Sequence, residues 1–208
     1  MKNPIISKLV ISPHIDDEVL GCSSALDSET HVIECGVDDF HIVSRDERLN
    51  ELTDVKNLRG FNFTLLENEV NSYKQNKIIN EITDAVNYHK PTEIYIPYPS
   101  YNQDHQEVYK ASLVALRPHD KNYFVKKVFV YEETQVNDWD FSHSINTGFK
   151  PNYFKKLDID LKIKSYQLMV SQVRKFRSSD YLRNIARLRG YQSGMEFAEA
   201  FQCIRFVE

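Results

Sequence analysis

Three kinds of feature are scarce or missing in this chain of 208 residues, and each absence excludes a class of protein. The three cysteines, Cys22, Cys35 and Cys203, are odd in number and far apart, which excludes a disulfide framework and a four-cysteine metal site. We expect each to be a small buried hydrophobic residue. No apolar run approaches the ~18 residues that span a bilayer, and the first residues lack the apolar stretch of a secretion signal.

The charge balance excludes another class. The net charge is only -4 and the isoelectric point is near 6.0, so no general basic field favours nucleic acid as a partner. Hydrophobic residues make up 41% of the chain, enough for a substantial core. No linker, repeat or low-complexity segment divides the sequence. We therefore expect one soluble, cytoplasmic domain over residues 1–208.

Short apolar runs alternate with segments of helical period, which is typical of an α/β fold. The predicted helices include one over residues 16–26 and one that begins at the capping box Ser44-Arg45-Asp46-Glu47 and stops at Gly60. This order predicts right-handed crossovers and a Rossmann-like three-layer sandwich with a mostly parallel sheet. The predicted strands are residues 8–12, 30–35, 61–66, 93–97 and 127–131.

The regular alternation of apolar runs and helical segments ends after residue 131. Residues 132–155 are polar and aromatic and favour a long loop or short irregular strands. The apolar spacing predicts one helix from Ile159 to Val173 and a second over residues 179–190, and residues 195–207 are expected to close the sheet as a strand.

Two polar clusters follow predicted strands: Ser12-Pro13-His14-Ile15-Asp16-Asp17-Glu18 and Tyr101-Asn102-Gln103-Asp104-His105. Ligands of open parallel sheets bind at the carboxyl ends of the strands, so the two clusters are expected to lie close together. Consecutive acids are costly to pack unless positive charge lies among them. The plainer alternative is that these acids only stabilise a helix start, with His14 an ordinary loop histidine.

A divalent cation would offset the acids far better than a helix end. His14 and Asp17 can converge on one ion, and His105 can complete a His-Asp-His set. Zinc accepts these ligands, and three protein ligands leave a position for water, as in catalytic sites. Asp16 would then be free to act as a general base. The spacing by itself does not name the reaction.

The stretch Pro-His-Ile-Asp-Asp-Glu-Val-Leu-Gly-Cys at residues 13–22 resembles the Pro-His-Pro-Asp-Asp-Glu signature of the PIG-L/LmbE-like N-deacetylases. The segment Asn-Gln-Asp-His at residues 102–105 stands where that family has His-Pro-Asp-His. Further similarity lies in Arg48-x-x-Glu51-Leu52, Ser171-Gln172, Arg189-Gly190 and residues 198–201, so the resemblance spans nearly the whole chain.

The resemblance implies a role for each matched residue. His14, Asp17 and His105 match the zinc ligands, and Asp16 matches the catalytic base. Arg48 matches an arginine that contacts the substrate. Asp104 matches an acid that orients neighbouring side chains around the metal.

Asn102 departs from the family pattern, because most members carry a histidine there. An amide can donate a hydrogen bond to an oxyanion but cannot deliver a proton. If the protein is active, we expect Asp16 to act as base and then as acid.

The resulting hypothesis is a zinc-dependent hydrolase that removes an acetyl group from an N-acetylated amino sugar, such as an N-acetylhexosamine conjugate. Two alternatives stay open: an amidase that acts on a non-sugar amide, and a metal-binding but catalytically idle sugar-recognition protein. A homo-oligomer is compatible with the sequence. The basic stretch from Arg174 to Arg189 is interpreted as a solvated helix face, with recognition of an anionic substrate group or partner as the alternative. Asp38 and Asp39 are interpreted as loop acids, with a place in the wall of the binding pocket as the alternative.

Overall fold

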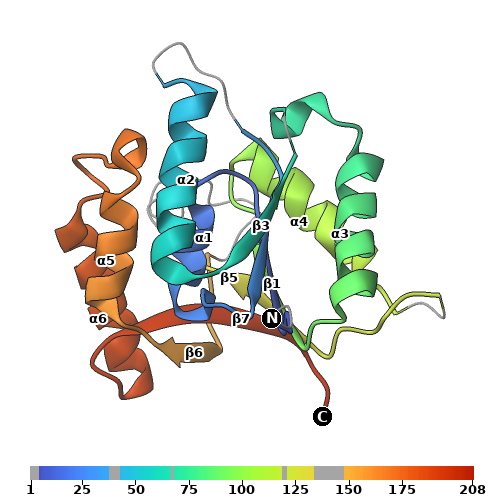
Figure 1. Ribbon diagram of the computed structural model, residues 1–208. Helices are drawn as coiled ribbons and strands as arrows, with labels where there is room; N and C mark the ends of the chain where they lie inside the picture. Colours follow the sequence, from blue (N-terminus) through green and yellow to red (C-terminus); the bar gives the residue numbers. More distant parts are fainter. Residues whose placement is uncertain (1–4, 38–42, 67, 119–120, 134–147) are drawn as a thin grey trace.

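The computed structural model of the protein describes residues 5–37, 43–66, 68–118, 121–133 and 148–208 (Figure 1). They form a seven-stranded sheet in the order β3-β2-β1-β4-β5-β7-β6. The first five strands of the chain are parallel, and β7 pairs antiparallel with both β5 and β6. The strands are β1 Lys8–Ser12, β2 Thr30–Glu34, β3 Asn62–Leu65, β4 Glu93–Pro97, β5 Lys127–Tyr131, β6 Tyr153–Lys156 and β7 Ala198–Phe206. The predicted α/β class and mostly parallel sheet are confirmed.

Helices cover both faces of the sheet and complete three layers, with α3 and α4 on one face and α1, α2, α5 and α6 on the other (Figure 1). The α-helices are α1 Asp17–Cys22, α2 Arg45–Arg59, α3 Gln75–His89, α4 Gln103–Ala115, α5 Ile159–Gln167 and α6 Ser179–Ser193. Short 3-10 helices are η1 Ser23–Ala25, η2 Val70–Ser72 and η4 Val170–Gln172. Within the described residues, no helix is long and apolar enough to cross a bilayer.

The two faces of the sheet build two separate cores, because successive side chains of a strand point to opposite faces. On β1, Leu9 and Ile11 pack in the core under α3 and α4, whereas Val10 packs in the core under α1 and α2. All three side chains are fully buried. Burial on both sides explains why the central strands read as continuous apolar runs.

The predicted ends of the second helix are confirmed by its caps. The Ser44 side chain accepts a hydrogen bond of 3.3 Å from the backbone N–H of Glu47. Gly60 ends the helix in the left-handed region, with φ of 85°, where a residue without Cβ has no steric cost.

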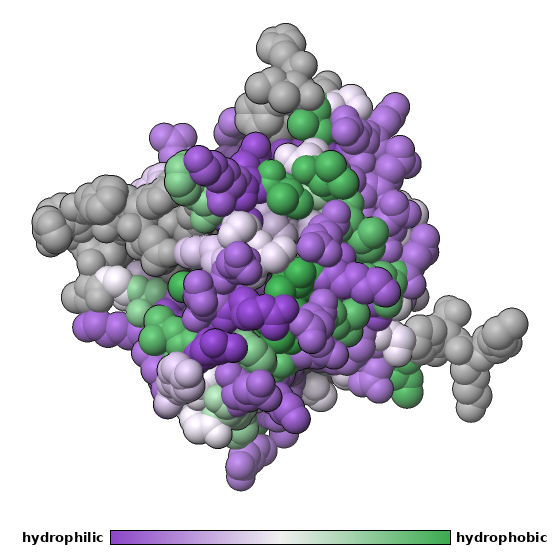
Figure 2. All heavy atoms as spheres, turned by 90° about the vertical axis from the view of Figure 1, so that its left-hand side faces the viewer, coloured by the Kyte–Doolittle hydropathy of each residue, from purple (hydrophilic) through white to green (hydrophobic). Residues whose placement is uncertain are grey.

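Two predicted helices are shorter than expected. The helix predicted over residues 16–26 ends at Cys22 and continues as η1. The helix predicted to reach Val173 ends at Gln167, and the chain then forms η4. Val170 and Val173 are 72% and 46% exposed, so they are not part of an inward stripe, while Met169 between the two helices is fully buried. Figure 2 shows this side of the molecule, where apolar side chains reach the surface in separate groups among hydrophilic ones.

Two other predictions concern segments that are only partly described. The loop or strand expected over residues 132–155 includes β6 at its end, and residues 134–147 lie outside the described residues. Asp38 and Asp39 also lie outside them.

The order of the strands reverses between β1 and β4. From β1 the chain moves to β2 and β3 on one side of the sheet, and then to β4 and β5 on the other. The carboxyl ends of β1 and β4 therefore lie side by side at the point where α/β proteins bind ligands. Both polar clusters of the sequence begin at these ends.

Gly21 provides a test of how α1 is seated on the sheet. A Cβ atom at this position would lie 2.3 Å from Cδ2 of Tyr131, whose hydroxyl donates a 3.0 Å hydrogen bond to the carbonyl of Ile11. We expect Gly21→Ala to lower the free energy of unfolding by about 1–3 kcal/mol, because the buried ring must shift. Urea unfolding measures the effect. The same substitution in a Tyr131→Leu background should cost less, and equal costs in both backgrounds would contradict this packing.

Candidate metal centre

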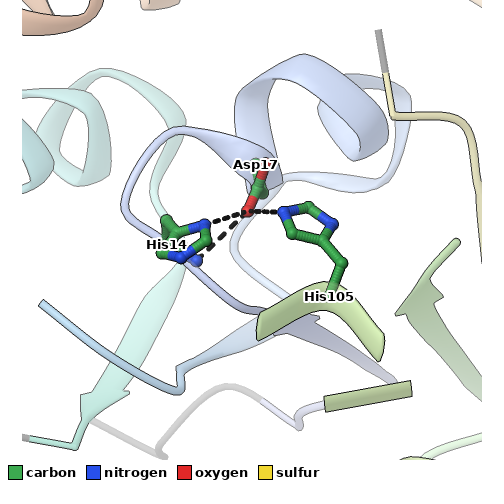
Figure 3. A group of neighbouring side chains, drawn as sticks. All are labelled: His14, Asp17 and His105. Carbon is green, nitrogen blue, oxygen red and sulfur yellow. Dashed lines mark hydrogen bonds and ion pairs between the residues drawn. The ribbon is translucent and has the colours of Figure 1, made fainter. Parts of the chain in front are cut away.

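His14, Asp17 and His105 converge at the sheet edge from three short segments (Figure 3). His14 lies in the turn after β1, Asp17 begins α1, and His105 lies in the first turn of α4. One ligand atom from each residue lies within 4.8 Å of the others. The Asp17 carboxylate oxygen Oδ2 is 3.4 Å from Nδ1 of His14 and 3.2 Å from Nε2 of His105. Sequence reasoning had selected these three residues.

A tight turn after β1 fixes the relative positions of His14 and Asp17. The backbone N–H of Asp17 donates to the carbonyl of His14 at 3.2 Å, and the N–H of His14 donates to Oδ2 of Asp17 at 3.1 Å. The turn requires a φ of 136° at Asp16, a backbone region that L side chains rarely adopt. Strain of this kind costs about 1–3 kcal/mol and is typical of functional sites.

A second carboxylate faces the far nitrogen of each histidine. Oδ2 of Asp104 lies 2.9 Å from Nε2 of His14, and Oε2 of Glu133 lies 3.2 Å from Nδ1 of His105. The hydrogen bond to Asp104 is of the kind that fixes the ring orientation and tautomer of a metal-binding histidine. The Glu133 contact is an ion pair, and neither of its two atoms makes a hydrogen bond among the described residues. The near nitrogens, Nδ1 of His14 and Nε2 of His105, are thereby presented toward Asp17.

Glu133 was not found from the sequence. It follows β5 by two residues, and β5 lies next to β4 in the sheet. An acidic residue after a third strand end is a signal that could have found it, once the order of the strands is known.

The titration of these groups reflects both burial and their neighbours. Burial favours the neutral form of Asp17, but His105 and His14 together hold the pKa of its carboxyl well below the usual range. Burial lowers the pKa of His105, and the charges of Asp17 and Glu133 outweigh this effect and raise it. Burial raises the pKa of Glu133 to about 7, against the charge of His105.

The donor set fits a zinc ion. Two imidazole nitrogens and one carboxylate oxygen are ligands that zinc accepts, and three protein ligands are typical of catalytic zinc. Acidic groups also outnumber the cations that face them, since Asp16, Asp17 and Glu18 are all buried. Positive charge among them would relieve this crowding.

Asp16 is held by an arginine from the far end of the chain. Its Oδ2 accepts a hydrogen bond of 2.8 Å from Nη2 of Arg177. The same guanidinium donates to the hydroxyl of Tyr166 at 3.2 Å and to the carbonyl of Gln172 at 3.1 Å. Burial raises the pKa of Asp16, and the charge of Arg177 opposes that shift. This network fixes the direction of the Asp16 carboxylate.

The interpretation of the basic stretch as a solvated face is wrong for two of its arginines. The side chain of Arg177 is only 13% exposed because it pairs with Asp16. Arg189 is equally covered and pairs with Glu132 after β5. Arg174 and Arg187 are exposed, as expected. The charge pattern could not separate these cases, because the acidic partners are distant in the sequence.

Arg48 and Asn102 flank the candidate centre. Arg48 is 6% exposed, and its Nε has no hydrogen-bond partner among the described residues. Its charge acts on Asp16, whose pKa it lowers. Asn102 caps α4, since its Oδ1 accepts a 2.9 Å hydrogen bond from the N–H of Asp104. The amide NH2 of Asn102 is therefore the end of the side chain that can donate elsewhere.

The metal assignment leads to a measurement. We expect the purified protein to bind close to one zinc ion per chain and His105→Ala to lose most of it, because two ligands hold zinc far more weakly than three. Elemental analysis after dialysis measures the metal. His89→Ala is the matched control, because this histidine lies at the end of α3 beside His31, away from the centre. Full occupancy in His105→Ala would contradict the assignment.

Comparison with known proteins places the fold. No protein-family model and no curated protein matches the sequence. Several solved structures do match, and three of them are described here. The conserved protein TT1542 from Thermus thermophilus is 18% identical with a TM-score of 0.77, over 98% of this chain and 96% of that one. GalB, the 4-carboxy-2-hydroxymuconate hydratase from Pseudomonas putida, is 18% identical with a TM-score of 0.76, over 97% and 98%.

The third match is the N,N'-diacetylchitobiose deacetylase from Pyrococcus horikoshii. It is 17% identical with a TM-score of 0.73, over 98% of this chain and 86% of that one. Structural similarity at such low sequence identity establishes the fold, and a fold alone does not determine a reaction. The resemblance seen in the sequence motifs is thus confirmed at this level: the chain has the LmbE-like fold of the PIG-L/LmbE-type deacetylases.

Proposed function

We propose that the protein is a zinc-dependent hydrolase that removes an acetyl group from the amide nitrogen of an N-acetylated amino sugar or its conjugate. The observation that carries the proposal is the convergence of His14, Asp17 and His105 beside an arginine-fixed Asp16. Amide hydrolysis needs an activated water, stabilisation of an oxyanion and a proton for the departing amine. The arrangement offers a group for each.

His14, Asp17 and His105 would hold the metal. When bound, zinc would supply a Lewis acid for the amide carbonyl and lower the pKa of a water molecule. Asp104 and Glu133 keep the two imidazoles turned toward Asp17. In the reaction itself these two carboxylates therefore act through the proposed metal ligands.

Asp16 is the proposed base and acid. Its buried carboxylate interacts electrostatically with both Asp17 and His14, which supports a place beside the centre. Arg177 occupies Oδ2 of Asp16, which leaves Oδ1 to take the proton from water and pass it to the amine. Arg177 is a positioning residue in this scheme, because it acts through Asp16.

Asn102 and Arg48 would contact the substrate. The amide NH2 of Asn102 can donate to the developing oxyanion, while its oxygen caps α4. The buried Nε of Arg48, with no partner among the described residues, supports a contact with a substrate oxygen. An idle binder would have no use for a strained aspartate fixed by a buried arginine.

The choice of an amino sugar is supported by the chitobiose deacetylase of the same fold. GalB has the same fold and is a hydratase, so acetate release must be measured directly. A screen of N-acetylhexosamine conjugates and non-sugar acetamides tests the proposal. Absence of acetate from every amide would overturn it, and release from the non-sugar amides alone would favour the amidase alternative.

The role of Asp16 predicts a large kinetic effect. We expect Asp16→Asn to lower kcat by roughly 10²–10⁴-fold, because the amide cannot accept the water proton. Zinc content should stay unchanged, since the three ligands remain. Asp54→Asn, on the exposed side of α2, is the control. A near-normal kcat in Asp16→Asn would mean that another group is the base.

The role of Arg177 predicts a smaller effect of the same kind. We expect Arg177→Gln to lower kcat by roughly 10–10²-fold with little change in KM, because a misplaced carboxylate reacts poorly. Arg177→Lys should recover part of the loss, since it keeps the charge but not the fork of donors. Arg174→Gln removes an exposed arginine of the same turn and should have no effect. Equal losses in both glutamine variants would argue against positioning.

The two ends of the Asn102 amide can be separated. Asn102→Ala removes the cap and the donor, whereas Asn102→Asp keeps the cap acceptor and removes the donor. We expect both to raise the activation barrier by about 1–3 kcal/mol, and only the alanine variant to lose about 0.5–2 kcal/mol of stability with its cap. Turnover and urea unfolding measure the two effects.

An unchanged kcat in Asn102→Asp would mean that Asn102 only caps α4 and does not act on the oxyanion. Asn102→His restores the usual residue of the resembling family and should be tolerated. If this variant releases acetate and the natural protein does not, the idle-binder alternative is correct.

A further inference from the structure

An open pocket of about 240 Å³ lies beside the candidate metal centre. Its walls come from η2 and the start of α3 on one side and from the first turns of α4 on the other. Asp104 belongs to both places: it lines the pocket, and its Oδ2 lies 2.9 Å from Nε2 of His14. A ligand in the pocket would therefore contact a side chain that touches the centre.

The polar lining consists of side-chain amides and carboxylates. Amides carry donors and acceptors together, and carboxylates accept, so the set matches hydroxyl groups. The polar groups are contributed by Asn71, Gln75, Gln103, Gln106, Asp104 and Glu107. No Lys, Arg or His is among the described residues that line the pocket. Two acids without a basic residue disfavour phosphate or carboxylate ligands.

The same walls include apolar surface and a linked pair of polar groups. Val70 and Ile78 are almost fully buried beneath the pocket, so the half-buried ring of Tyr73 provides the apolar surface on which the C–H face of a sugar can pack. Nε2 of Gln75 donates a 3.3 Å hydrogen bond to Oε2 of Glu107 and thereby joins the two walls. Polar groups around a small apolar patch are typical of a specific ligand site.

We propose that this pocket binds a second sugar ring of the substrate, uncharged or carrying an amine, while the ring with the acetamide lies at the metal centre. The proposal rests on the proposed function and adds the substrate class, an amino-sugar disaccharide or its conjugate. The volume is below the ~300–1,000 Å³ of sites for drug-sized ligands, which suits a single ring. The acids Asp104 and Glu107 favour an amine over an anion.

Binding is tested on the whole chain with chitobiose, the glucosamine disaccharide, which has no acetyl group to lose. The side-chain NH2 signals of Gln75 and Gln106 in NMR spectra report on the pocket. We expect them to shift in a saturable way with chitobiose and much less with glucosamine. The zinc-poor His105→Ala variant should show the same shifts, because the pocket does not require the metal.

Gln75→Ala should raise the Kd for chitobiose by about 3–10-fold, as expected for one lost hydrogen bond. The matched control is Asn76→Ala, which removes an exposed amide from the same turn of α3. Unmoved Gln75 and Gln106 signals up to ~20 mM sugar would overturn the proposal. So would equal Kd values for the two variants, or tighter binding of a sugar phosphate than of the unphosphorylated sugar.

The two proposals fail separately. Saturable shifts at Gln75 and Gln106 without acetate release from any substrate would support the pocket and overturn the proposed function. Acetate release with unmoved signals, and with the same KM for the disaccharide in Gln75→Ala and Asn76→Ala, would overturn the pocket alone.

Discussion

The buried acidic residues that follow β1 determine which side chains can pack around them. Each acid there is accommodated in a different way. Asp17 faces two imidazoles, and Asp16 faces a guanidinium. Burial raises the pKa of Glu18 to about 8, so this carboxyl favours the neutral form at pH 7, and burial also raises the pKa of Glu34 well above its usual value. The two aspartates differ from these glutamates in having basic partners, which are His14 and His105 for Asp17 and Arg177 for Asp16.

The parallel sheet brings those partners together. The ends of β1, β4 and β5 are consecutive along one edge and deliver, in turn, His14, His105 and Glu133. The antiparallel strands β7 and β6 extend the sheet beyond β5, and the helices that connect to them carry Arg177 back to β1. The C-terminal part of the chain thus contributes a contact to the candidate site, through Arg177.

Sequence reasoning succeeded where a feature is local. The turn residues His14 and Asp17, the cap at Ser44 and the strands with apolar runs all depend on near neighbours in the chain. It failed where a contact is distant: Arg177 is 161 residues from Asp16. The apolar spacing that continued to Val173 was also misleading, because a pattern of hydrophobic residues does not show which of them reach the core.

The positive φ of Asp16 limits what can replace it during evolution. Glycine adopts such backbone angles freely, and β-branched or bulky residues fit them worst. Most substitutions would therefore damage the turn that holds His14 and Asp17, and selection for folding would remove them together with selection for activity. Asparagine is the exception, since it has the shape of aspartate and adds no strain, but its amide accepts no proton. Under the proposed function, Asp16→Asn would therefore end catalysis while leaving the turn and the three proposed ligands in place.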